Sequence, residues 1–174
     1  MVGAPHAGSF EAVRWLNGDN ETLGKLSLLD ITNSKRDIQK IVSRYPGILE
    51  LLPHDEDQSD YADAHYWQNL IDTAGRKVPQ PRVRDLRAAR DSWRTMADLP
   101  SDGSFMKSVV GWSRDGTIND LKHLPPDGSG LPGREIARIE YQPTYRGDGT
   151  VTWASSRLPG VQMWYVPDAE HEEY

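Results

Sequence analysis

Residues 2–9, with the sequence VGAPHAGS, are the stretch that decides the fold. Val2 to Ala4 is typical of the last residues of a buried strand, and Pro5 cannot continue the strand as a hydrogen-bond donor. A chain usually starts with a polar tail that frays at little cost, so a strand end here is unexpected. We therefore predict that this strand joins a sheet of which part is missing from the sequence.

Helical signals follow from about residue 10 to about residue 100. Ser9 is a suitable N-cap for a short helix through Leu16. Asn33 or Ser34 can cap a second helix, in which apolar residues recur with helical spacing. A third helix is predicted to start near Asp85, and no clear strand lies between these segments.

After residue 100 the pattern changes to strands. Residues 105–112 (FMKSVVGW), 134–142 (REIARIEYQ) and 160–166 (GVQMWYV) each predict a strand. Residues 120–133 (DLKHLPPDGSGLPG) are rich in proline and glycine and predict a loop, not a pair of strands. A helical middle followed by strands, with one strand at the start, predicts an α/β sheet that carries a helical insertion.

Composition excludes several classes of function. The net charge is −6, so a nucleic acid partner is not expected, because an acidic chain repels phosphate. The chain has no cysteine, which excludes thiolate metal sites and cysteine nucleophiles. No apolar run approaches the roughly 18 residues of a transmembrane segment. The first residues lack the basic and apolar regions of a signal peptide, so this segment favours the cytoplasm over secretion.

Two short motifs near the end of the chain suggest chemistry when they are taken together. GDGTV, residues 147–151, places Asp148 in a turn after one predicted strand, and His171 follows the last predicted strand. Alone, each is more typical of a turn or a surface histidine. An acid followed by a histidine is the chain order at the end of an α/β-hydrolase triad, in which the carboxylate holds the imidazole in one tautomer.

These motifs resemble those of lipase-like α/β-hydrolases, in particular the lecithin:cholesterol acyltransferase-like group. VGAPHAGS resembles the family's GTPH-x-GS segment, with Ala4 where threonine is usual. GDGTV resembles the acid loop, and SSRLPGVQMWYVPDAEH resembles the final core strand and histidine loop. The resemblance implies that Asp148 and His171 are the triad acid and base. It also implies three regions: a core strand end and loop at 1–10, a helical cap insertion at 11–104, and C-terminal core strands at 105–174.

The sequence contains no G-x-S-x-G nucleophile motif. In the resembling family this motif precedes GTPH-x-GS, so we expect the serine, with the first strands of the sheet, to lie upstream of Val2. The expected function is that of the C-terminal part of a serine esterase, lipase or acyltransferase. Its substrate would be a small-molecule ester or lipid, no cofactor is expected, and the missing segment would come in cis or from a second chain in trans.

Other residues allow two interpretations each. Tyr66, Trp67, Trp93 and Trp112 are candidates to line a substrate cleft, but aromatic residues at such spacing also pack helices together. Asp115 is an alternative triad acid. His6 lies next to the expected active site, but the resemblance places it in a structural loop. The acidic stretch at 54–65 lacks the glycine and glutamate of a calcium loop, so no metal is expected.

A second class of function stays open from the sequence. A hydrolase-like fold that has lost its nucleophile would be a catalytically inactive binding module, which would use the cap or the sheet edge to hold a partner. The absence of the serine fits both interpretations equally well. An upstream reading frame that encodes G-x-S-x-G would favour the enzyme.

Overall fold

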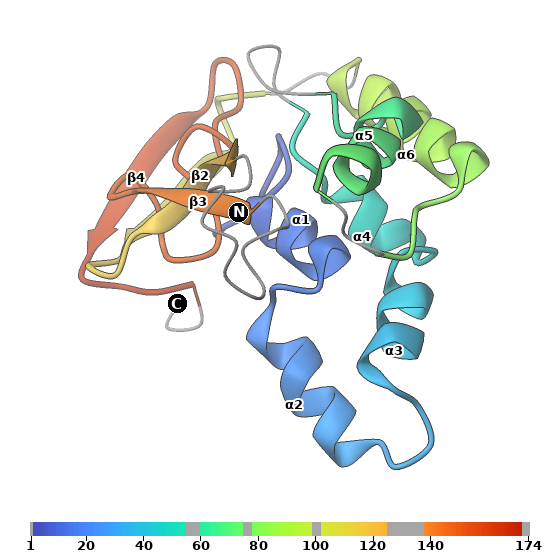
Figure 1. The fold of residues 1–174 in the computed structure, drawn as a ribbon. Helices are drawn as coiled ribbons and strands as arrows, with labels where there is room; N and C mark the ends of the chain where they lie inside the picture. Colours follow the sequence, from blue (N-terminus) through green and yellow to red (C-terminus); the bar gives the residue numbers. More distant parts are fainter. Residues whose placement is uncertain (1, 55–59, 75–77, 99–101, 125–137, 172–174) are drawn as a thin grey trace.

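The computed structural model describes residues 2–54, 60–74, 78–98, 102–124 and 138–171. Within these residues, helices come first and strands follow (Figure 1). The helices are α1 (Phe10–Asn17), α2 (Glu21–Leu29), α3 (Lys35–Val42), α4 (Pro46–Glu50), α5 (Ala64–Ala74) and α6 (Val83–Ala97). The strands are β1 (Lys107–Trp112), β2 (Thr117–Leu124), β3 (Arg138–Thr144) and β4 (Gln162–Pro167).

A small parallel sheet joins the two ends of the chain. β1 and β4 pair in parallel over their whole length, from Lys107 opposite Gln162 to Trp112 opposite Pro167. Val2 forms a parallel bridge to Val109 on the other side of β1, and the Gly3 N–H donates to the Val109 carbonyl at 2.8 Å. The described residues thus combine helices with strands, among them a small parallel sheet, which is compatible with the α/β class.

A second pair of strands corrects the prediction of a loop at 120–133. Residues 120–124 belong to β2, which pairs antiparallel with β3. The strand forms because its apolar side has something to pack on: Leu121 is buried in the core beside the helices. Residues 125–133 of the predicted loop lie outside the described residues.

Local capping explains where two of the helices start. The Ser9 hydroxyl accepts a hydrogen bond from the Glu11 N–H at the start of α1. Ser34 and Asp37 form a reciprocal capping box at the start of α3. Both helices are confirmed; α3 ends at Val42, and Pro46 opens the next helix, α4.

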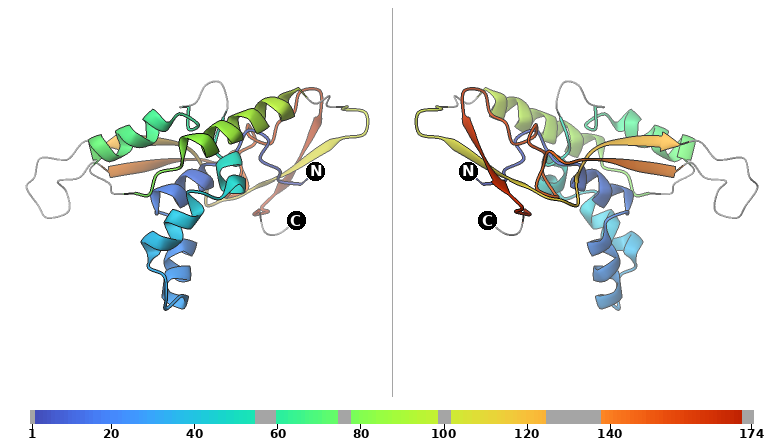
Figure 2. Two further views of the ribbon diagram at one scale, coloured as in Figure 1. Left: turned by 90° about the vertical axis from the view of Figure 1, so that its right-hand side faces the viewer. Right: turned by 90° about the vertical axis from the view of Figure 1, so that its left-hand side faces the viewer.

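The main core lies between the helices and the β2–β3 hairpin. Its largest fully buried side chains from the helical segment include Trp67, Tyr61, Leu16, Leu49 and Leu86. The parallel pair β1–β4 and the antiparallel pair β2–β3 extend to opposite sides of the molecule (Figure 2). α2 and α3 project together away from it (Figures 1 and 2). Among the described residues, no helix is long and apolar enough to cross a membrane.

Candidate functional site

The structure brings Asp148 and His171 together. The His171 Nδ1 atom lies 2.9 Å from the Asp148 Oδ2 atom, although the residues are 23 positions apart. A second bond joins their backbones, because the His171 N–H donates to the Asp148 carbonyl at 2.8 Å. The Asp148 side chain is fully buried, whereas about a third of the His171 side chain is exposed. This is the geometry that an acid needs in order to orient a histidine, and the catalytic role of the pair stays a prediction.

The two oxygens of the Asp148 carboxylate have different partners. Its Oδ1 atom accepts the backbone N–H groups of Thr150 at 3.0 Å and Val151 at 2.7 Å. Its Oδ2 atom faces the imidazole of His171. The two backbone donors fix the rotation of the carboxylate, so the turn itself aims Oδ2 at the ring. We call residues 147–151 the acid loop.

Three other segments hold the acid loop in place. Gly149 has a left-handed backbone with a φ of 92°, and its N–H donates to the Thr117 hydroxyl of β2 at 2.8 Å. The Ser9 hydroxyl donates to the Thr150 carbonyl at 2.7 Å. After β1, the Ser113 N–H donates to the Gly147 carbonyl at 2.8 Å. The VGAPHAGS segment and β2 therefore both support the loop that carries Asp148.

We predict that Thr117→Val destabilises the protein by about 0.5–1.5 kcal/mol. Thr117 is completely buried, and valine is close to it in shape but cannot accept the Gly149 N–H. That N–H would lose its partner at the wall of the open depression, because Gly149 itself is exposed. Urea unfolding of the variant measures the loss.

The matched control for this prediction is Thr117→Ser, which keeps the hydroxyl group and removes one methyl group. We expect it to cost less than Thr117→Val, since the bond to Gly149 survives. An equal or larger loss in the serine variant would show that packing, and not this hydrogen bond, makes Thr117 important.

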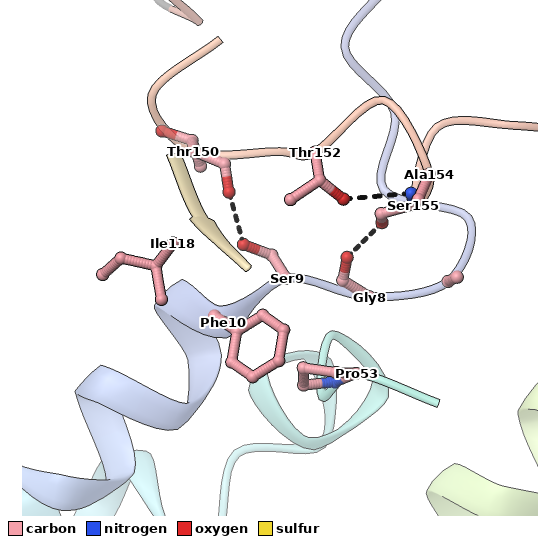
Figure 3. Close-up of a pocket in the computed structure, with 10 residues that line it drawn as sticks. Gly8, Ser9, Phe10, Pro53, Ile118, Thr150, Thr152, Ala154 and Ser155 are labelled. Atoms are coloured by element: carbon pink, nitrogen blue, oxygen red, sulfur yellow. Dashed lines mark hydrogen bonds between the residues drawn. The ribbon is translucent and has the colours of Figure 1, made fainter. Parts of the chain in front are cut away.

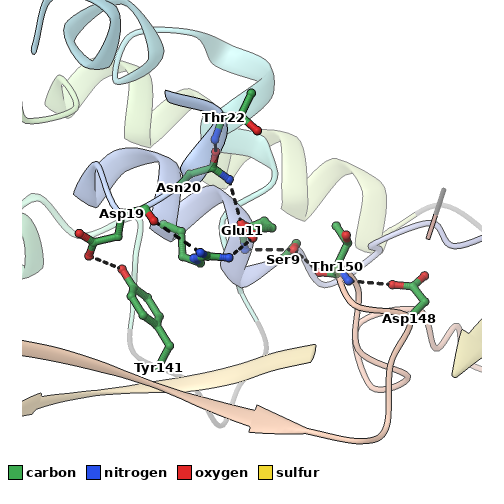
Figure 4. A network of polar contacts seen from close by, with 9 residues as sticks. Ser9, Glu11, Asp19, Asn20, Thr22, Tyr141, Asp148 and Thr150 are labelled. Carbon is green, nitrogen blue, oxygen red and sulfur yellow. Dashed lines mark hydrogen bonds and ion pairs between the residues drawn. The ribbon is translucent and has the colours of Figure 1, made fainter. Parts of the chain in front are cut away.

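An open depression of about 480 Å³ lies beside His171. Its walls come from α1, the start of α2, the residues after β1, the acid loop and the histidine. Polar contacts organise the α1 side: the Glu11 carboxylate pairs with Arg14 at 2.6 Å and accepts a bond from Asn20 (Figure 4). Tyr141 joins this network by donating to Asp19 at 2.8 Å. A polar group of a small molecule in this depression could reach the imidazole of His171.

A second, enclosed space beneath the VGAPHAGS segment is too small for a ligand. Its volume is about 10 Å³, and it is bordered by Ser9, Phe10 and Ser155 among others (Figure 3). The Ser155 hydroxyl donates to the Gly8 carbonyl, and the Ala7 N–H donates to the Ser155 carbonyl. This segment is therefore packed against the residues that follow the acid loop, and it has a structural role.

The aromatic residues proposed for a cleft occupy different environments. Trp67 and Trp93 are buried in the helical core, where their Nε1 atoms donate to the carbonyls of Tyr61 and Glu50. Tyr66 is partly buried and packs against the same core, whereas Trp112 is exposed at the end of β1. Packing accounts for the first three residues, and a role of any of the four in a cleft stays a prediction.

Asp115, the alternative acid, borders the same depression, and its N–H donates to the Ser113 hydroxyl. The carboxylate that pairs with His171 is that of Asp148. Burial lowers the pKa of His6, and its Nε2 atom is buried with no hydrogen-bond partner among the described residues. No cluster of potential metal ligands occurs in the described part of the chain, and residues 55–59 of the acidic stretch lie outside it.

Sequence reasoning missed two supports of the site. Thr117 lies in β2, which was not predicted as a strand, and its hydroxyl accepts the Gly149 N–H of the acid loop. Arg114 forms an ion pair with Asp168, 54 residues later. No local signal marks either contact, because both join segments that are distant in the sequence.

Comparisons with known proteins add no assignment: the chain matches no family model, no curated protein and no solved structure.

Proposed function

We propose that this chain supplies the acid, the base and the helical cap of a serine hydrolase or acyltransferase of the α/β-hydrolase type. The observation that carries the proposal is the buried Asp148 carboxylate, 2.9 Å from the Nδ1 atom of His171. The acid precedes the histidine in the chain: Asp148 follows β3 of the antiparallel pair, and His171 follows β4 of the parallel sheet. This chain order of acid and histidine is that of an α/β-hydrolase triad.

In the proposed reaction, the residues of this chain move and stabilise a proton. A serine from a segment upstream of Val2, or from a second chain, attacks the acyl carbonyl of the substrate. The Nε2 atom of His171 takes the serine proton and then gives it to the leaving group. Asp148 keeps the ring in the tautomer with a proton on Nδ1 and stabilises the charged imidazole.

The proposed substrate is an ester or a lipid-like molecule. The depression beside His171 has polar walls, so it suits the ester and head-group region more than an acyl chain. The helical segment at 11–104 is proposed as the cap over the site. Hydrolysis follows if water reaches the acyl-enzyme, and acyl transfer follows if an alcohol does.

The alternative function is a catalytically inactive binding module. Large side chains are exposed along and next to the parallel sheet, namely Trp112, Trp164 and Tyr165. Exposed aromatic residues of this kind are typical of surfaces that bind a partner. The genomic sequence upstream of Met1 separates the two functions: an open frame with G-x-S-x-G supports the enzyme, and a promoter supports the module.

We predict that this chain alone does not react with a fluorophosphonate probe. A chain extended at its N-terminus by the upstream frame that contains G-x-S-x-G should react, and His171→Ala in that longer chain should abolish the reaction because the serine loses its base. Gel fluorescence and mass spectrometry of the labelled peptide measure both results.

The control for the labelling experiment is His65→Ala, which removes an exposed histidine of α5 and should leave labelling unchanged. Labelling of any serine within residues 1–174 would contradict the proposed function. Equal labelling of the extended chain with and without His171 would do the same.

A further inference from the structure

A second ion pair, separate from Asp148 and His171, links the segments that follow β1 and β4. The Arg114 guanidinium, just after β1, makes two hydrogen bonds to the Asp168 carboxylate, just after β4, at 2.8 and 2.7 Å. Two parallel bonds fix the relative orientation of the groups as well as their distance. Asp168 lies three positions before His171, in the segment that we call the histidine loop (residues 168–171).

The backbone of Asp168 is in an unusual conformation. Its φ is 53°, and it is the only non-glycine residue with a positive φ in the described part of the chain. Such a backbone costs energy for a residue with a side chain, and aspartate is among the few residue types that tolerate it. The side chain of this same residue is the one that Arg114 holds through two hydrogen bonds.

Three loops are tied to one another in a closed ring. Residues 113–116, which follow β1, bond to the acid loop through the Ser113 N–H and the Gly147 carbonyl. The acid loop bonds to the histidine loop through both contacts of Asp148 with His171. The Arg114–Asp168 ion pair closes the ring between the histidine loop and residues 113–116.

We propose that Arg114 and Asp168 are positioning residues that hold the histidine loop so that the His171 imidazole stays on Asp148. The inference rests on the proposed function for its meaning in catalysis. Both side chains are more than half exposed, so the pair contributes little to global stability. Its effect is local, on the orientation of one ring.

Each charge of the Arg114–Asp168 pair stabilises the other, so both groups are ionised at neutral pH. The hydrogen bonds from Arg114 lower the pKa of the Asp168 carboxyl below its usual value, and the same contact raises the pKa of Arg114. The contribution of a carboxylate with a lowered pKa is present above its usual pKa and is lost as the pH falls through the lowered value. The pair is therefore intact under ordinary assay conditions.

The test compares Asp168→Asn and Arg114→Gln with the unmodified chain by nuclear magnetic resonance. Asparagine keeps the size and the tolerance for positive φ, so Asp168→Asn removes only the charge. Nitrogen-15 shifts of His171 report which ring nitrogen carries the proton, and we expect both variants to lose part of the Nδ1–H tautomer. Amide exchange at the His171 N–H should become about two- to fivefold faster, as expected for loss of an exposed ion pair.

The matched control is Arg94→Gln, which removes the same charge from another exposed ion pair, with Asp91 on α6. It should change neither the tautomer of His171 nor the amide exchange rate at the His171 N–H. Arg114→Lys, which keeps the charge, should retain more of the Nδ1–H tautomer than Arg114→Gln does. The tautomer decides the outcome. An unchanged tautomer in Asp168→Asn and Arg114→Gln overturns the inference, whatever the amide does, and so does an equal change in Arg94→Gln.

Failure of the proposed function gives a different result. In that case His171→Ala leaves the activity of the serine-bearing chain unchanged, while the tautomer of His171 still responds to Asp168→Asn. Failure of the inference leaves the tautomer unchanged, while His171 stays essential for activity. The two experiments therefore test the role of the histidine and the role of the ion pair separately.

Discussion

Asp148→Asn is expected to reduce the turnover of the serine-bearing enzyme by up to about 10⁴-fold. The structure explains why the amide cannot replace the acid. The Oδ1 position accepts two backbone N–H groups, from Thr150 and Val151, so the amide oxygen of asparagine would occupy it. The amide nitrogen would then face His171 Nδ1 and donate to it. The ring would be held with its proton on Nε2, where it cannot accept the proton of the serine.

The control for this prediction is Asp115→Asn. It makes the same chemical change in the same depression, but Asp115 is not the carboxylate that contacts His171 in the described contacts. We expect a change in turnover of less than tenfold. Steady-state kinetics with a chromogenic ester measures both variants. A loss of less than tenfold in Asp148→Asn would remove Asp148 from the triad, and a large loss in Asp115→Asn alone would assign the acid to Asp115.

Features set by neighbouring residues were predictable from the sequence. Ser9 caps α1, and Ser34 caps α3 through a box with Asp37, because both caps depend on residues within one helical turn. The approach of Asp148 to His171 was also expected, but from the order of motifs and not from local chemistry. The segments that form β1 and β4 were also predicted as strands, since each has its own apolar pattern, but the sequence did not predict that they pair with each other in parallel.

Features that depend on distant partners were not predictable. β2 carries Asp120, Lys122 and His123 among its apolar residues, so its sequence does not indicate a strand; pairing with β3 and burial of Leu121 define it. α2 was missed for a related reason, because most of its apolar side chains are not buried and the core imposes little periodicity on it. The contacts of Thr117 and of Arg114 with the site arise only when the chain is folded.

Trp67→Ala is expected to destabilise the protein by about 3–5 kcal/mol, as large truncations in a packed core do. Trp67 is 1% exposed, its Nε1 atom donates to the Tyr61 carbonyl at 2.8 Å, and its ring packs against Tyr66. Alanine would leave a cavity and an unpaired carbonyl in the middle of the helical segment. Because domains are stable by only about 5–15 kcal/mol, urea unfolding should show a large loss or complete unfolding.

Trp112→Ala is the matched control, because Trp112 is 42% exposed and we expect it to cost about 1 kcal/mol or less. If Trp67→Ala does not fold, Trp67→Phe keeps an aromatic ring and should still lose measurably more stability than Trp112→Phe. Comparing stability with KM for the Trp67 variants also distinguishes a core residue from a residue that lines a substrate cleft. A residue that lines a substrate cleft would change KM in the serine-bearing enzyme with little loss of stability, and that result for Trp67 would contradict its place in the core.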